Sequence, residues 1–237
     1  MAEKFEVKWQ GILPGDPQQV FDGFTLHLAG WLWPAEFEPR VGGAERGITA
    51  DGGTVTEWDP PRRFQTRAIR SDGLPNQLDY TLEARGEGTS LEYVHSGEFG
   101  DDHDEQLDAC RQHTEFYLHT FGEYIGHFAD RDAAYVEIEA SGDFGEVRRC
   151  LGLDDETAVG DRVSFQPDDL PAAEATVDYI APHFVGLCTG DALIRVFGRE
   201  PWGGGTSVAL HLFDPSADAE EAGRAWTGWL ADQKAVA

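Results

Sequence analysis

The feature that most constrains this chain is a ladder of alternating segments that ends in one long amphipathic stretch. In residues 77–83, Leu78, Tyr80 and Leu82 share one parity, while polar and charged residues take the other. Residues 89–96 alternate in the same way after a glycine-rich turn. Alternation with a period of two predicts strands of an antiparallel sheet with one buried face.

Directly after this ladder the hydrophobic period changes. From Leu107 to Phe128, apolar residues recur at spacings of three and four, which predicts one amphipathic helix of roughly 20 residues. Because one helix follows the meander of strands, its apolar stripe is expected to be buried across the concave face of the sheet. Earlier in the chain, Asp16 and Pro17 predict a capped helix start, and Ile48 is expected to begin a strand that ends at the Gly52 turn.

A similar plan starts again near Asp130. The segment from Gly86 to His95 resembles the segment from Gly203 to His211, since both join a glycine-rich turn, a Thr-Ser pair and a strand. Strands are expected at residues 134–139, 163–165, 175–181, 193–197 and 206–213, and helices at 143–151 and 219–230. We therefore expect two tandem copies of one α+β plan, residues 1–131 and residues 132–237, the second copy shorter and trimmed.

Charge and cysteine content narrow the function classes. The chain of 237 residues has 44 acidic and 18 basic residues and a net charge of −26, which argues against nucleic-acid and anionic-membrane partners. No apolar run reaches the ~18 residues of a membrane-spanning helix. Cys110, Cys150 and Cys188 match no zinc or disulfide spacing, so we expect buried thiols in a cytoplasmic protein, with no His or Asn arranged beside them.

The order of motifs in the first half resembles a known family. The residues that carry the likeness are Ile12–Phe21, Trp31-Leu32-Trp33-Pro34, Pro39-Arg40-Val41-Gly42-Gly43, Glu57-Trp58-Asp59-Pro60-Pro61-Arg62-Arg63-Phe64 and Gly88-Thr89-Ser90-Leu91. This set resembles the START-like helix-grip superfamily, which includes polyketide cyclases, and within it the branch named for homologues of the heat-shock-protein-90 ATPase activator. The likeness spans roughly residues 5–128.

The resemblance implies a fold and a cavity. It implies a seven-stranded antiparallel sheet wrapped around a long C-terminal helix, with an apolar hollow between them. It does not imply chaperone work, because one fold hosts many functions.

Aromatic residues with an expected inward direction form the candidate ligand-binding set. The set, together with one histidine, is Trp31, Trp33, Phe37, Trp58, Phe64, Tyr80, Tyr93, His95, Tyr117 and Phe121. Such rings can stack on a planar apolar ligand, or they can be ordinary core. His95 follows the parity of Leu91 and Tyr93, so its imidazole is expected to point into the hollow, where it could orient a ligand, unless it is only hydrogen-bonded at the rim of the sheet.

Other chemistries find little support in the sequence. The histidines of the long helix, His113, His119 and His127, are six and eight residues apart, which is not the spacing of a metal-ligand pair, and Asp101–Glu105 lacks the pattern of a calcium loop. Asp143-Phe144-Gly145 has none of the other kinase motifs. We therefore expect no metal, no cofactor and no evident catalytic residue.

Three functions compete on these grounds. The first is non-catalytic binding of a small apolar or aromatic molecule. The second is a protein-interaction module related to heat-shock-protein-90 ATPase activators. The third is a polyketide cyclase or aromatase-like enzyme, in which His95, Tyr80 and Tyr93 would move protons.

Overall fold

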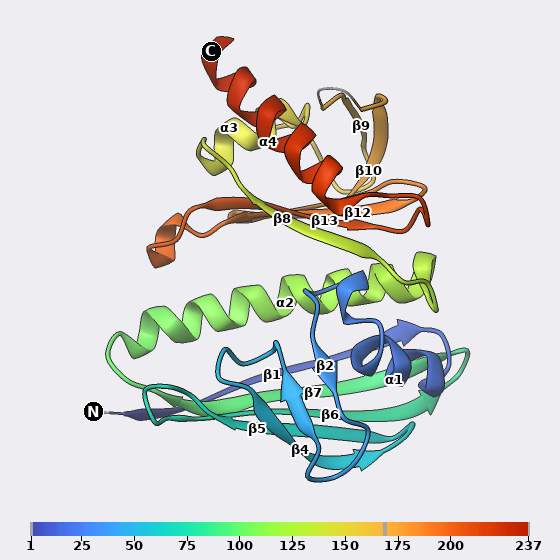
Figure 1. Ribbon diagram of the computed structural model, residues 1–237, viewed down its shortest axis with the longest axis vertical. Helices are drawn as coiled ribbons and strands as arrows, with labels where there is room; N and C mark the ends of the chain where they lie inside the picture. The colour runs from blue at the N-terminus through green and yellow to red at the C-terminus, as the bar shows by residue number, and fades with distance from the viewer. Residues whose placement is uncertain (1, 168–169, 237) are drawn as a thin grey trace. The chain divides into compact units, whose positions relative to one another are not determined.

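The structure is a computed structural model that describes residues 2–167 and 170–236, with side chains of the last helix described as far as Asp232. The chain divides into two compact units, Met1–Arg131 and Asp132–Ala237. Each unit is α+β and joins an antiparallel sheet to a C-terminal helix (Figure 1). In the described ranges, no helix combines the length and the apolar character needed to cross a membrane.

The first unit contains a seven-stranded sheet. Its strands are β1 (Glu3–Pro14), β2 (Glu36–Phe37), β3 (Ala44–Arg46), β4 (Gly53–Asp59), β5 (Arg63–Ile69), β6 (Pro75–Arg85) and β7 (Gly88–Phe99). Their order across the sheet is β1-β7-β6-β5-β4-β3-β2, so the first strand pairs with the last. The helices are α1 (Pro17–Thr25), the short 3-10 turn η1 (Leu28–Gly30) and α2 (His103–Phe128), and α2 packs on β1 and β7.

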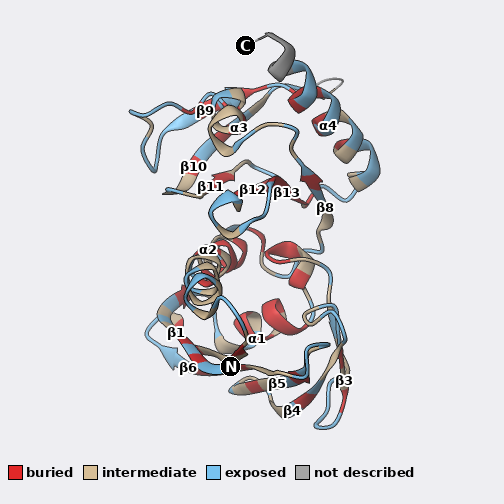
Figure 2. Ribbon diagram, turned by 90° about the vertical axis from the view of Figure 1, so that its left-hand side faces the viewer, coloured by how far each residue is buried: buried red, intermediate tan, exposed pale blue. Residues whose placement is uncertain are grey.

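Local sequence explains how α1 begins and why it lies where it does. Asp16 accepts hydrogen bonds from the backbone N–H groups of Gln18 and Gln19, and the Gln19 side chain accepts one from the Asp16 N–H, which completes a capping box. The apolar face of α1, which includes Phe21 and Phe24, is buried (Figure 2). The predicted start at Asp16 is confirmed.

A cluster of aromatic rings forms part of the core of this unit. Phe24 contacts Phe64 of β5 and Phe121 of α2, and Phe21 contacts Trp58 of β4 edge to face. Phe64 and Phe121 are almost completely inaccessible to solvent. The rings join α1 and α2 to the middle of the sheet.

The second unit contains a six-stranded sheet. Its strands are β8 (Ala134–Glu139), β9 (Arg162–Phe165), β10 (Ala173–Ala181), β11 (Phe184–Cys188), β12 (Ala192–Gly198) and β13 (Thr206–Leu212). Their order is β8-β13-β12-β11-β10-β9, so again the first strand pairs with the last. The helices are α3 (Phe144–Cys150), the 3-10 turn η2 (Glu200–Trp202) and α4 (Ala219–Val236).

Large aromatic side chains fill the core of the second unit beneath α4. Trp226 and Trp229 lie edge to face with ring centroids 5.4 Å apart, and both contact Phe165 of β9. Leu230 and the inner residues of β10 to β13 complete this cluster.

Three of the differences between the secondary structure and the sequence-based expectation have a clear physical reason. Ile48 lies in a bend between β3 and β4, because the strand ends earlier, at Arg46. β11 was missed, since its residues Phe184–Cys188 are almost all buried and so show no alternation. The long helix has 26 residues, more than the roughly 20 expected, because its polar first turn adds residues ahead of the apolar stripe.

Candidate functional site

A cavity of about 520 Å³ lies within the first unit, between the ends of β6 and β7 and the first half of α2. Two loops complete its wall, the segment Trp31–Trp33 after η1 and the bend Ile48–Ala50 before β4. The volume is in the range of pockets that hold small organic molecules. Most of the lining is apolar, with a few polar groups in it.

Strand register determines which side chains reach the cavity. Tyr80 of β6 is paired with Tyr93 of β7, and Leu78 is paired with His95, so these four side chains follow one another on the same face of the sheet. The rings of Tyr80 and Tyr93 are 4.9 Å apart. Burial raises the pKa of both tyrosines above the usual value of 10, so their hydroxyls are neutral.

Aromatic side chains form a second wall of the cavity on the side of α2. Trp33 and Tyr117 meet edge to face with ring centroids 5.6 Å apart, and the Trp33 indole N–H donates a 2.7 Å hydrogen bond to the Gly47 carbonyl. The Trp33 ring is therefore held by a contact outside the cavity as well as by Tyr117 within it. Planar rings on two sides of a hollow suit a flat, apolar ligand.

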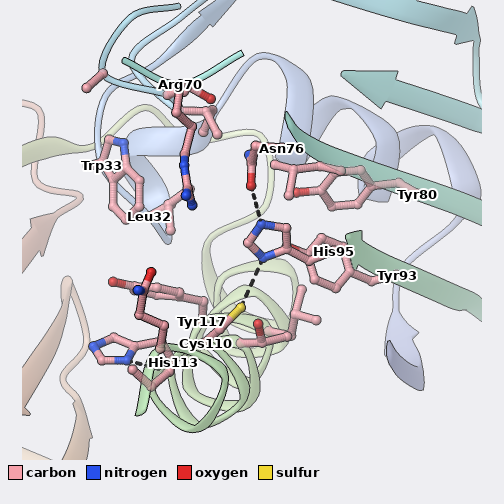
Figure 3. Close-up of a pocket in the computed structure, with 18 of the residues that line it drawn as sticks. Leu32, Trp33, Arg70, Asn76, Tyr80, Tyr93, His95, Cys110, His113 and Tyr117 are labelled. Carbon is pink, nitrogen blue, oxygen red and sulfur yellow. Dashed lines mark hydrogen bonds between the residues drawn. The ribbon is translucent and has the colours of Figure 1, made fainter. Parts of the chain in front are cut away.

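Three polar side chains of the cavity lining are joined in a row by hydrogen bonds (Figure 3). The His95 Nε2 atom is 2.6 Å from the Asn76 side-chain oxygen, and its Nδ1 atom is 3.1 Å from the Cys110 sulfur. The amide oxygen can only accept, so Nε2 carries the hydrogen, and Nδ1 accepts from the thiol. Phe5 meets the imidazole edge to face from the other side, which fixes the ring further.

Burial keeps the side chains of His95 and Cys110 uncharged. Desolvation lowers the pKa of His95 to about 4, with a smaller contribution from the positive charge of Arg70. Desolvation also raises the pKa of Cys110 to about 11. At neutral pH the site therefore holds a neutral imidazole beside a protonated thiol.

Arg70 is a charged group that lines the same cavity. Its side chain points into the cavity beside Asn76 and Trp33 (Figure 3). A 2.7 Å ion pair with Asp72 and a position over the Phe99 ring hold the guanidinium in place. It can offer hydrogen-bond donors to a carbonyl or an acidic group of a ligand.

The ten residues of the candidate set separate into two groups. Those that line the cavity are Trp31, Trp33, Tyr80, Tyr93, His95 and Tyr117. Those that lie outside its lining are Phe37, Trp58, Phe64 and Phe121, which pack in or beside the aromatic core. For the first group, a role in ligand binding stays a prediction. The residues of the second group have a packing role instead, because their rings contact one another and their neighbours in α1 and α2.

Sequence reasoning missed several polar residues of the cavity, among them Cys110, Asn76 and Arg70. Cys110 was expected to have no arranged His or Asn partner, which is wrong, because α2 brings it against His95 of β7 and Asn76 of β6. Arg70 was also missed. Cys110 lies in the apolar stripe of α2, and this position could have predicted that its thiol faces the sheet. The position of Asn76 beside the far end of β7 depends on the strand register, which the sequence pattern does not give.

Three histidines of α2 lie near two different groups of the same helix. The His113 Nδ1 atom lies 2.8 Å from the Ala109 carbonyl, and the residue lines the cavity. His119 and His127 both lie near Glu123, at 3.9 and 3.4 Å.

Comparisons with known proteins bear on the first unit above all. The profile of the family described as activator of Hsp90 ATPase homolog 1-like protein matches residues 15–126, which run from the start of α1 almost to the end of α2. A comparison with the curated proteins gave no match.

Solved structures similar to the chain are distant in sequence. Protein MLL2253 from Mesorhizobium loti is 18% identical, with 52% of this chain and 98% of that chain covered and a TM-score of 0.45. The Aha1 dimer from Colwellia psychrerythraea is 14% identical, with 51% and 96% covered and a TM-score of 0.42. DynU16, from the dynemicin biosynthetic locus, is 13% identical, with 98% and 96% covered and a TM-score of 0.43.

The family match follows the elements that build the cavity. It includes α1, the loops of the rim, strands β2 to β7 and nearly all of α2. With the motif order of the sequence, the match identifies residues 15–126 of the first unit as a domain of the family described as activator of Hsp90 ATPase homolog 1-like protein.

Proposed function

We propose that the first unit binds one small, largely apolar molecule with an aromatic or otherwise flat body, in the cavity between α2 and the strands β6 and β7. The observation that carries this proposal is a hollow of about 520 Å³ where a sheet and a helix would otherwise pack directly. Protein interiors are normally filled to the density of organic crystals. A hollow of this size, lined by ordered aromatic rings, is the kind of feature that ligand sites have.

The polar groups that line the cavity suggest how a ligand would be oriented. Both ring nitrogens of His95 already have partners, so this histidine is poorly placed to accept a hydrogen bond from a ligand. Arg70 is the better candidate, since its guanidinium has donors left beyond the ion pair with Asp72. We infer that the ligand carries a carbonyl or an acidic oxygen at one end of an apolar body.

The architecture in which this site would work is also a proposal. We infer that the sheet of each unit wraps around its final helix as a helix grip, and that the two units are tandem copies of one plan. Support comes from the strand orders, because in both units the first strand pairs with the last and the final helix follows that last strand. The second copy is shorter, with six strands.

A dye-binding experiment on the full chain tests the proposed function. The probe is 1-anilinonaphthalene-8-sulfonate, which has flat rings and an anionic group. We expect its fluorescence to rise on binding and to saturate at about one molecule per chain. Ala109 lines the cavity, so Ala109→Phe should fill it and abolish saturable binding.

The matched control lies two residues further along the same helix. Arg111 is exposed and is outside the cavity lining, so Arg111→Phe should leave dye binding unchanged. Circular dichroism of both variants establishes that they are folded. Equal dye binding by Ala109→Phe and the unmodified protein would show that the dye binds elsewhere and that the proposal is wrong.

A further inference from the structure

Cys110, His95 and Asn76 form a hydrogen-bonded array whose order is thiol, imidazole and amide. The Cys110 sulfur contacts Nδ1 of the histidine, and Nε2 of the same ring contacts the asparagine oxygen. Papain-like proteases use a set of the same residue types, in which the imidazole takes the proton of the thiol and the amide orients the ring. The three side chains here come from α2, β7 and β6 and all line the cavity.

The imidazole is built to stay in one orientation. It has the amide on one side, the thiol on the other and the edge of the Phe5 ring 5.0 Å away between centroids. Since Nδ1 is the unprotonated nitrogen, it is the atom able to accept the thiol proton. The pair is neutral at rest, so the proton would move only as the sulfur attacks, which is general-base catalysis.

The position of Cys110 in the helix decides which reaction class fits. It is the eighth residue of α2, so its backbone N–H is used within the helix and cannot help form an oxyanion hole beside the sulfur. Acyl transfer depends strongly on such a hole. Addition of a thiol to a double bond conjugated to a carbonyl needs a base and a group near the distant carbonyl oxygen. Arg70 lines the same cavity, beside Asn76 (Figure 3).

We propose that Cys110 is a nucleophile that adds to an α,β-unsaturated carbonyl compound held in the cavity, with His95 as general base and Asn76 as the residue that positions the imidazole. This inference rests on the proposed binding function of the same cavity. The S–H bond breaks as Nδ1 of His95 takes the proton, and a bond forms between sulfur and the β-carbon. The electron pair of the double bond moves toward the carbonyl oxygen, near Arg70, and the imidazolium then returns the proton to the α-carbon. Nothing leaves and nothing is oxidised or reduced, so the product is the thioether adduct.

The test uses benzylideneacetone, an aromatic enone, with the full chain. We expect one adduct on Cys110, located by peptide mass mapping, and formed faster than the adduct on Cys150 of the same chain. Cys150 is a fair internal standard, because burial raises the pKa of its thiol as well. His95→Gln should slow the reaction at Cys110 by on the order of a hundredfold and leave the rate at Cys150 unchanged.

Two variants of Asn76 separate a positioning role from a merely structural one. Asn76→Ala should slow the reaction several-fold. Asn76→Asp places a carboxylate against the imidazole and favours its charged form, so it should speed the reaction by on the order of tenfold. A hydrogen bond that only supports the fold predicts no gain. Asn76→Asp also keeps the test valid if His95→Gln does not fold.

A saturated analogue distinguishes failure of this inference from failure of the binding function. The probe is 4-phenylbutan-2-one, which has the same ring and carbonyl but no reactive double bond, and its binding to Cys110→Ser is measured by calorimetry. If the ketone binds but the enone adds to Cys110 no faster than to Cys150, or at a rate that His95→Gln does not change, the inference is overturned and the binding function stands. If neither the ketone nor the naphthalene dye binds, the binding function fails and the inference fails with it.

Discussion

The two units use the same order of strand pairing but differ in what lies beneath the final helix. In the first unit α2 presents Cys110, Thr114 and Tyr117 to a cavity. In the second unit α4 presents Trp226 and Trp229 to a packed cluster. The difference shows that a final helix that follows the same strand order can border either a cavity or a packed cluster.

Element length and side-chain size together explain the difference. β6 and β7 have 11 and 12 residues and α2 has 26, whereas β12 and β13 have seven residues each. α1 lies over one end of the sheet (Figure 1), and the cavity lies beside the part of α2 that carries Ala109, Cys110 and Thr114. In the second unit two tryptophans contact Phe165 of the sheet beneath α4.

The largest expected effect is on the packed core of the second unit. Trp226→Ala should lower the free energy of unfolding of that unit by about 3–5 kcal/mol, because it removes a buried ring and leaves a hole. Tyr117→Ala in the first unit should cost clearly less, since its ring already borders a cavity. Hydrogen exchange measured by mass spectrometry reports each unit separately, and Thr227→Ala on the exposed side of α4 is the control. Equal losses of unfolding free energy for Trp226→Ala and Tyr117→Ala would show that the two helices are packed equally tightly, which contradicts the difference between the units.

The polar side chains of the cavity should make the first unit sensitive to acid. His95 has a pKa of about 4 in the folded chain and 6.5 as its ordinary value, so below pH 6.5 protons bind the unfolded chain preferentially. The free energy of unfolding should therefore fall as the pH drops from 6.5 to about 4, by up to about 3 kcal/mol from this residue.

Urea denaturation at a series of pH values checks this expectation against His95→Gln, which has no imidazole to protonate. The variant should lose less stability than the unmodified protein over that window. Parallel curves for His95→Gln and the unmodified protein would contradict the assignment of a buried, neutral imidazole.

Filling the cavity should make the first unit more like the second. Ala109→Leu adds apolar atoms where the wall is open, so we expect the free energy of unfolding to rise by up to about 2 kcal/mol while dye binding is lost. Arg111→Leu is the control, because it adds similar atoms on an exposed face of the same helix turn. A loss of stability in thermal denaturation for Ala109→Leu alone would indicate that the wall has no free space.

The smallest expected effects test whether the units are energetically separate. Asp16 caps α1 and Asp143 caps α3, each with a capping box. Asp16→Ala and Asp143→Ala should each cost about 1 kcal/mol. Hydrogen exchange should show the loss only in the unit that carries the substitution. A loss spread over both units would mean that they unfold together.

Much of the secondary structure could be predicted from the sequence because it follows from local patterns. The alternation of Leu78, Tyr80 and Leu82, the change of period at Leu107 and the cap at Asp16 each depend on neighbours a few residues apart. β11 escaped prediction because a fully buried strand has no polar face to reveal its period.

The site was less predictable because it depends on contacts between distant elements. Inward parity predicted that Tyr93 and His95 reach the cavity, and both line it. Phe64 and Phe121 were included for their aromatic rings, and both are buried in the core. Ring size and hydrophobicity do not distinguish a residue that lines a cavity from one that is packed in the core. The array of Cys110, His95 and Asn76 joins two strands and a helix, so it appears only when their register is known.

A crystal structure of the full chain soaked with 1-anilinonaphthalene-8-sulfonate tests most directly whether the first unit has a ligand cavity and the second a packed core. We expect electron density for one dye molecule bounded by Tyr93, Cys110 and Tyr117, and continuous side-chain density beneath α4. Side chains closing the space between α2 and the sheet, or a dye molecule lying beneath Trp226 and Trp229 instead, would contradict it.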